Sequence, residues 1–314
     1  MLGTALAALA LPVWNLLVDP FQVFQTPLLV ADGPTLNERF RKVEHLTGQP
    51  GKHDAFLIGT SAMGAVEPSL ADARFPGRRF YNLSMFAAQP GEILSALRAL
   101  KAAGVPVKTV VYGLEPGPFH VGRAYGPATR AHYAASGASR WRFGFDCLFA
   151  SSPAEGLRRI AEQFKAVPSI HYDIGGTGRY HLDAYEREIQ ADPERFIWEN
   201  VRGAQPPPFA GGWIGRHFED FGRLLDWLRA EGIAHTVYLN PLHPALRGMY
   251  GEARLAEFGR KIREAGKLDS LPDCGRILDG DFERMFYDLR HFRPAAGEKI
   301  FDCVFGPREI AVRH

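Results

Sequence analysis

Three residue types that act together in acyl transfer occur at two distant places in this chain. Ser61 follows an apolar run, in the stretch AFLIGTSAMG (residues 55–64). Asp288 and His291 lie three residues apart near the carboxyl terminus, in FYDLRHF (residues 286–292). A serine hydroxyl is a weak nucleophile until a base removes its proton, and a carboxylate can orient that base. The sequence therefore predicts a Ser-His-Asp site, provided that the fold brings the two places together.

Each of these residues also has an ordinary structural interpretation. Serine is a favoured N-cap residue, so Ser61 could simply begin a helix. Asp288 could cap the helix that follows, with His291 as a solvated neighbour. The three together favour the catalytic interpretation, because a tight turn with this spacing lets the carboxylate of Asp288 fix the imidazole of His291.

The elements that must position these residues alternate between strands and helices. Strands are predicted at residues 55–59, 79–84, 107–116, 234–241 and 275–280, and helices at residues 90–104, 216–233, 251–266 and 295–306. Such alternation indicates a parallel sheet that is covered by helices on both faces. Residues 117–213 break the pattern, and we expect them to form a long insertion after the third strand, over the carboxyl ends of the strands.

Two polar residues outside the triad follow predicted strands and would lie at the same edge. Glu115 could bind substrate or accept backbone hydrogen bonds. His243, in LNPLHP, could contact substrate or act as the base in place of His291, although Asn-Pro and His-Pro favour an ordinary turn. Asp279 and Asp281 have no histidine three residues on, so we interpret them as turn residues.

Taken together, Ser61 after the first strand and the late Asp288-x-x-His291 resemble the SGNH (GDSL-like) hydrolase superfamily. The resemblance covers residues 54–116 and 214–306 and implies a doubly wound, flavodoxin-like α/β fold. It assigns the nucleophile to Ser61, the orienting acid to Asp288 and the base to His291. It also implies acyl transfer at carbohydrate esters, as an esterase or an O-acetyltransferase, with no cofactor and no metal.

The sequence departs from the pattern of that superfamily after the third strand. GLEPG (residues 113–117) stands where a typical hydrolase has Gly-x-Asn-Asp, so the usual asparagine donor to the oxyanion is missing. Asn82, in the block YNLSMFAAQPGE, could substitute for it. These departures resemble the membrane-anchored, extracytoplasmic branch of the superfamily, which modifies cell-surface polysaccharides. That branch implies an acylated carbohydrate or acyl donor as ligand and a membrane acyltransferase as a candidate partner.

The amino-terminal segment supports the same expectation. Residues 1–18 contain no charged side chain and approach the length of a membrane span, although Pro12 interrupts them. We expect them to be an anchor or uncleaved signal in the bacterial inner membrane, with residues 19–314 as one periplasmic or extracytoplasmic domain. A buried amino-terminal helix is the alternative. The net charge of +2, without a long basic run, makes nucleic acid a poor partner.

Two further features leave alternatives open. The three cysteines, at positions 147, 274 and 303, show no metal or redox spacing; buried thiols are favoured, and one disulfide is the alternative. The segment SIHYDIGGTGRYH (residues 169–181) could form a sugar-binding surface or an ordinary loop. For the whole chain, the rival to an enzyme is a catalytically inactive SGNH-like scaffold that binds polysaccharide or a membrane acyltransferase.

Overall fold

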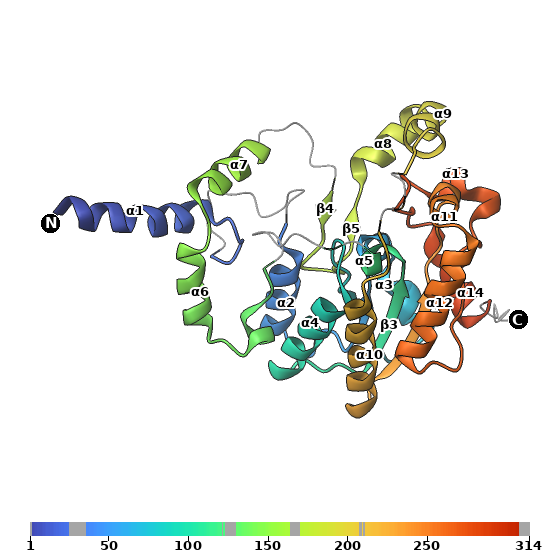
Figure 1. The fold of residues 1–314 in the computed structure, drawn as a ribbon, viewed down its shortest axis with the longest axis horizontal. Helices are drawn as coiled ribbons and strands as arrows, with labels where there is room; N and C mark the ends of the chain where they lie inside the picture. The colour runs from blue at the N-terminus through green and yellow to red at the C-terminus, as the bar shows by residue number, and fades with distance from the viewer. Residues whose placement is uncertain are drawn as a thin grey trace, which may run out of the picture.

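The computed structural model describes residues 2–24, 36–120, 122, 130–163, 170–206, 209 and 211–307. It is an α/β structure, drawn in Figure 1. The strands are β1 (Ala55–Ile58), β2 (Phe80–Asn82), β3 (Thr109–Leu114), β4 (His171–Tyr172), β5 (Tyr180–His181) and β6 (Ala234–Leu239). The helices of the sheet domain are α2 (Glu38–Gly48), α3 (Pro68–Asp72), α4 (Pro90–Ala102), α10 (Gly215–Ala230), α11 (Pro244–Tyr250), α12 (Glu252–Gly266), α13 (Phe282–Met285) and α14 (Ala296–Phe305). The remaining helices are α1 (Leu2–Val18), α5 (Gly117–His120), α6 (Arg140–Phe149), α7 (Pro153–Gln163), α8 (Asp183–Ala191) and α9 (Pro193–Phe196), with short helices at η1 (Ser61–Ala65), η3 (Tyr133–Ser136), η4 (Ile197–Arg202) and η5 (Asp279–Asp281).

The centre of the fold is a parallel sheet with the strand order β2-β1-β3-β6. β1 pairs with both β2 and β3, with Phe56 opposite Tyr81 on one side and Val110 on the other. This order, with helices around the sheet, confirms the doubly wound, flavodoxin-like fold and the long insertion after the third strand. The carboxyl ends of β1 and β3 are neighbours, which is where ligands bind in sheets of this kind.

Alternation along the strands divides the core into two layers. Phe56 and Ile58 of β1 face a cluster that helices α2, α4, α10 and α12 complete. Ala55 and Leu57 face the opposite cluster, which includes α3, α14 and the β4–β5 hairpin. Both faces of the sheet are therefore buried, as the near-continuous apolar runs of the strands indicate.

The insertion, residues 117–213, separates into two parts in the structure. Helices α6 and α7 pack beside the carboxyl-terminal half of α1, at one end of the molecule (Figure 1). The β4–β5 hairpin instead packs against η1, close to the carboxyl end of β1. Only the second part therefore lies where the sequence predicts the whole insertion.

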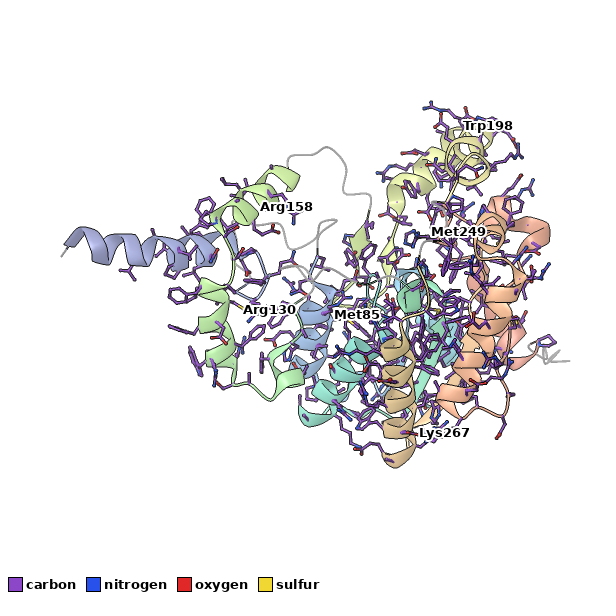
Figure 2. The ribbon with its side chains drawn as sticks, in the orientation of Figure 1. Met85, Arg130, Arg158, Trp198, Met249 and Lys267 are labelled. Atoms are coloured by element: carbon purple, nitrogen blue, oxygen red, sulfur yellow. A yellow bond between two sulfur atoms is a disulfide. The ribbon has the colours of Figure 1, made fainter. Side chains whose placement is uncertain are left out.

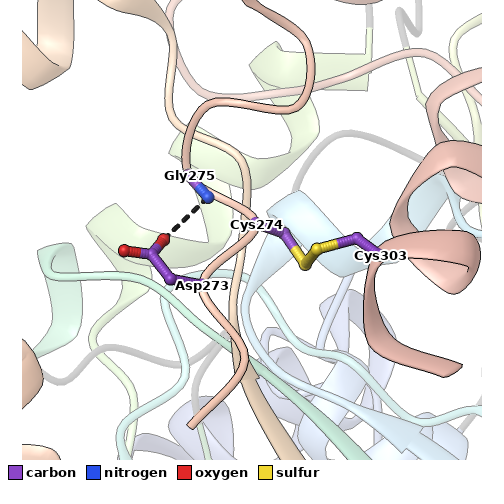
Figure 3. Close-up of a disulfide and its surroundings, with 4 residues drawn as sticks. All are labelled: Asp273, Cys274, Gly275 and Cys303. Carbon is purple, nitrogen blue, oxygen red and sulfur yellow. Dashed lines mark hydrogen bonds between the residues drawn. A yellow bond between two sulfur atoms is a disulfide. The ribbon is translucent and has the colours of Figure 1, made fainter. Parts of the chain in front are cut away.

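Two predictions from the sequence are wrong. Residues 275–280 form turns and the start of η5 instead of a strand, and the neighbouring Asp273 makes only an isolated bridge to Leu239. Leu278 is buried and Ile277 is partly buried, but both extend from a turn, in which Asp273 Oδ1 accepts a hydrogen bond from the N–H of Gly275 at 2.8 Å. The thiols of Cys274 and Cys303, expected to be free, form a disulfide (Figure 3).

The amino-terminal segment is helical, as helix α1. Within the part of the chain that the structure describes, no helix combines the length and the apolar character that crossing a bilayer requires.

Candidate active site

The structure brings Ser61, Asp288 and His291 together, although 230 residues separate the serine from the histidine. The hydroxyl Oγ of Ser61 lies 3.0 Å from Nε2 of His291. The other ring nitrogen, Nδ1, lies 2.8 Å from Oδ2 of Asp288 and 3.0 Å from Oδ1. The side chain of His291 is 21% exposed, so the imidazole is reachable from solvent while its acid partner holds it in place. This is the geometry in which a base removes the serine proton and a carboxylate fixes the base.

A tight turn at the end of β1 places the serine. Gly59 has φ +151°, and a Cβ atom there would lie 2.7 Å from Cγ of Met63, so a side chain is excluded at this position. Thr60 then caps the short helix η1: its Oγ1 accepts a hydrogen bond from the N–H of Ala62 at 3.2 Å. Ser61 is the first residue of that helix, where backbone N–H groups have no partner within the helix. The Ser61 N–H is therefore available to an anion beside its own hydroxyl.

A second tight turn, between Tyr287 and His291, places the acid and the base. Oδ1 of Asp288 accepts hydrogen bonds from the N–H groups of Arg290 and His291, at 2.7 and 2.8 Å. The N–H of Tyr287 donates to the carbonyl of His291 at 2.8 Å and closes the turn. Phe286 and Phe292 pair as an antiparallel bridge at its base.

The charge state of Asp288 follows from this turn. Burial of the carboxyl would raise its pKa, but the hydrogen bond and the charge of His291, with the two backbone N–H donors, outweigh that effect. The pKa of Asp288 therefore lies below its ordinary value, so the group is ionised at neutral pH and stabilises an imidazolium.

Residues of the insertion hold both turns, which the sequence analysis did not predict. The hydroxyl of Tyr180, from β5, donates to the carbonyl of Ser61, and its ring meets the ring of His291 edge-on with centroids 6.3 Å apart. Glu186, from α8, accepts a hydrogen bond from the hydroxyl of Tyr287 at 2.5 Å and forms an ion pair with Arg293 at 2.6 Å. Neither residue belongs to a motif, so only the fold reveals that they support the site.

Glu115 lies beside the turn that carries Ser61, at the end of β3. It accepts a hydrogen bond from the hydroxyl of Thr60, the residue before Ser61. Burial raises the pKa of Glu115 above its ordinary value, although the hydrogen bond from Thr60 and the positive charges of His291 and Arg290 act in the opposite direction. Glu115 thus contacts the residue that positions the serine, and the structure records no direct bond from Glu115 to the triad.

Asn82 lies beneath the turn and supports its backbone. Its amide Nδ2 donates to the carbonyls of Met63 at 2.8 Å and Val66 at 3.0 Å, and its Oδ1 accepts from the hydroxyl of Ser84 at 2.6 Å. Its amide protons are thus directed at carbonyl groups, whereas the expected role was to donate to an oxyanion. In this structure Asn82 fixes the short helix that carries Ser61.

His243 is buried and caps helix α11, since its Nδ1 accepts a hydrogen bond from the N–H of Ala245 at 3.2 Å. Its ring packs edge-on against Phe282 and Phe286. This is the turn arrangement that the prolines favour. It places His243 behind the loop that carries His291, where the structure records no bond to Ser61.

Of the segment 169–181 the structure describes residues 170–181, and their polar groups are largely engaged within the protein. Asp173 accepts hydrogen bonds from the N–H groups of Gly176 and Thr177, at 3.1 and 2.8 Å. Arg179 forms an ion pair with Glu67. Among the described residues, moreover, no group of three metal-ligating side chains gathers at this segment or elsewhere.

Comparison of the sequence with models of protein families, and with curated proteins, finds no match to either. The fold and the site therefore define this protein as a flavodoxin-like α/β structure that holds a Ser-His-Asp constellation at the carboxyl edge of its sheet.

Proposed function

We propose that this protein is an SGNH-type serine acyl-transfer enzyme that acts on carbohydrate esters, as an O-acetyltransferase or an acetylesterase of a cell-surface polysaccharide. The observation that carries the proposal is the 3.0 Å contact between Ser61 Oγ and His291 Nε2, backed by Asp288. A scaffold that only binds would have no use for a hydroxyl, an imidazole and an ionised carboxylate in this order.

The reaction follows from the positions of these groups. His291 Nε2 takes the proton of Ser61 as Oγ attacks the carbonyl carbon of an ester. The N–H groups of Ala62 and Met63 are bonded to Thr60, so we assign the contact with the oxyanion to the N–H of Ser61. The bond to the leaving alcohol then breaks, and His291 gives that alcohol its proton.

The second half of the reaction runs in reverse with a new acceptor. A sugar hydroxyl or a water molecule loses its proton to His291 and attacks the acyl group on Ser61, which regains its proton as it leaves. Transfer to sugar and hydrolysis differ only in the acceptor, so exclusion of water from the site decides between them.

The disulfide supports the proposed location outside the cytoplasm. Disulfides persist in oxidising compartments such as the bacterial periplasm and are rare in the cytosol. Cys274 and Cys303 are bonded with their Cα atoms 6.1 Å apart. We therefore propose a periplasmic or extracytoplasmic domain held at the inner membrane by α1, within reach of a membrane acyltransferase as partner.

The proposal is tested by turnover of 4-nitrophenyl acetate by the purified protein. Ser61→Ala and His291→Ala should each lower kcat by about 10⁴-fold or more, because the members of a triad act as a unit. Ser69→Ala, at an exposed position of the adjacent helix α3, is the matched control and should retain activity. Turnover that does not depend on Ser61 would favour the inactive scaffold.

A further inference from the structure

Large apolar side chains are exposed at one end of the molecule, far from the triad. Among the described residues, most of the exposed large apolar side chains lie on three helices, and Phe86 and Trp198 are exposed elsewhere. The three helices carry Leu9, Val13, Leu16 and Leu17 on α1, Trp141, Phe145 and Phe149 on α6, and Leu157 on α7. Trp141 is 89% exposed and Phe145 is 62% exposed. Single exposed apolar side chains are ordinary on a protein surface, whereas several gathered together indicate a contact surface.

On helix α6 the exposed residues form a single stripe. Trp141, Phe145 and Phe149 follow one another at a spacing of four, so they share one face of the helix. Phe143 and Cys147, on the opposite face, are buried in a cluster with Phe40. Helix α6 therefore has one apolar face that packs against the protein and a second one that is open to the surroundings.

The three helices form one unit. The amide of Asn15, on α1, donates to the carbonyls of Leu148 and Ser151 at 2.8 and 3.0 Å, and Asn15 is fully buried. Gly156 of α7 packs so closely on Trp14 that a Cβ atom there would lie 2.5 Å from the indole nitrogen. Helix α1 thus leaves the body directly beside α6 and α7, and Figure 1 shows it projecting away from the sheet domain.

We propose that this surface, formed by Trp141, Phe145 and Phe149 of α6, lies in the interface of the lipid bilayer that receives α1. Helix α1 carries no charged residue over its 17 positions, which suits hydrocarbon. Tryptophan and phenylalanine are typical of helices that lie at the level of the headgroups.

The charged residues of α6 also suit contact with a lipid bilayer. Arg140 and Arg142 flank Trp141, and both are exposed, against the single acidic residue Asp146 of that helix. Arg140 also forms an ion pair with Glu44 at 3.1 Å, although its side chain remains 70% exposed. Arginines beside an aromatic stripe can reach anionic lipid headgroups while their stems cover the apolar surface. The first part of the insertion is therefore a membrane-contacting element, which holds the catalytic domain at a defined position relative to the bilayer. This inference does not depend on the acyl chemistry.

The test uses a fluorescent label on the full chain. Cys147 is buried, and Cys274 and Cys303 are bonded to each other, so a single introduced cysteine can be labelled. Trp141→Cys is labelled with nitrobenzoxadiazole and reconstituted into vesicles of phosphatidylethanolamine and phosphatidylglycerol. The matched control is Trp198→Cys, since Trp198 is 63% exposed and Figure 2 shows it at the far side of the molecule from α7, where Arg158 is labelled.

The dye at position 141 should shift its emission to the blue and lose intensity when the acyl chains carry bromine, whereas the dye at position 198 should do neither. Leu9→Cys reports separately whether α1 enters the bilayer. A dye that is quenched at position 9 but water-exposed at position 141 would overturn the inference and leave the anchor intact. Protection of position 141 only after a membrane-protein extract is added would overturn it in favour of a protein partner. Turnover of 4-nitrophenyl acetate by the same samples reports on the proposed enzyme independently.

Discussion

The disulfide between Cys274 and Cys303 encloses the loop that carries both Asp288 and His291, so its reduction tests how the site is held. The bond joins the segment after α12 to helix α14, across a separation of 29 residues. Closing a loop of that length removes chain entropy from the unfolded state worth about 3.6 kcal/mol at room temperature. If the domain unfolds in one step, an unfolding entropy of about 2.1 cal/mol/K per residue converts this to a Tm lower by about 6 °C in the reduced protein.

The assay is differential scanning calorimetry of the wild-type protein with and without a thiol-free phosphine reductant. The variant Cys274→Ala with Cys303→Ala should show a low Tm that the reductant does not change. Cys147→Ala is the matched control, because Cys147 is a buried free thiol outside the disulfide. The Tm of this variant should still fall on reduction. An equal Tm for the oxidised and reduced wild-type proteins would refute the reasoning.

Three further predictions concern the residues that build the site. Asp288→Asn should lower kcat by about 10⁴-fold, because the imidazole of His291 loses the partner that fixes its tautomer. The pKa of Asp288 is lowered in the folded protein, so the ionised carboxylate contributes stability above the ordinary pKa of 3.8, and this stability is lost as the pH falls through the lowered pKa. Acid-unfolding curves of the variant should lack this loss. The pKa of Glu115 is raised in the folded protein, so the protonated carboxyl contributes stability below pH 4.5, and this stability is lost as the pH rises through the raised pKa. In urea titrations, Glu115→Gln should therefore gain stability relative to the wild type between acid and neutral pH. A difference in unfolding free energy between the two proteins that does not change with pH would contradict this. Gly59→Ala should lower the free energy of unfolding by about 1–3 kcal/mol in urea titrations, because the new Cβ would lie 2.7 Å from Cγ of Met63. Gly48→Ala, whose Cβ would have nothing within 4 Å, should lose far less. Equal losses in the two variants would count against the turn geometry.

Much of the fold is predictable from the sequence because its signals are local. The four paired strands of the sheet are short apolar runs, and the helices between them carry apolar residues at helical spacing. The exception is residues 275–280, where the buried Leu278 and the partly buried Ile277 resemble a strand in sequence but lie in a turn. A short apolar run does not distinguish these cases, because both bury the same side chains.

The triad is predictable because each of its two turns has a recognisable local pattern. The residues that hold those two turns in place are not predictable, because they contact the turns across long separations in the chain. Tyr180 bonds to Ser61 from 119 residues away, and Glu186 bonds to Tyr287 from 101 residues away. The disulfide is likewise not predictable from the sequence, because cysteine spacing alone does not give the pairing.

The most direct test of the central claim, that Ser61 is a nucleophile, is to trap an acyl group on the protein. The protein is mixed with an aryl acetate, quenched in acid during turnover, digested and mapped by mass spectrometry. The account predicts one acetyl group on the peptide that contains Ser61, and none on that peptide in the His291→Ala variant. An acetyl group on a different side chain, or one on Ser61 that forms equally fast without His291, would contradict it.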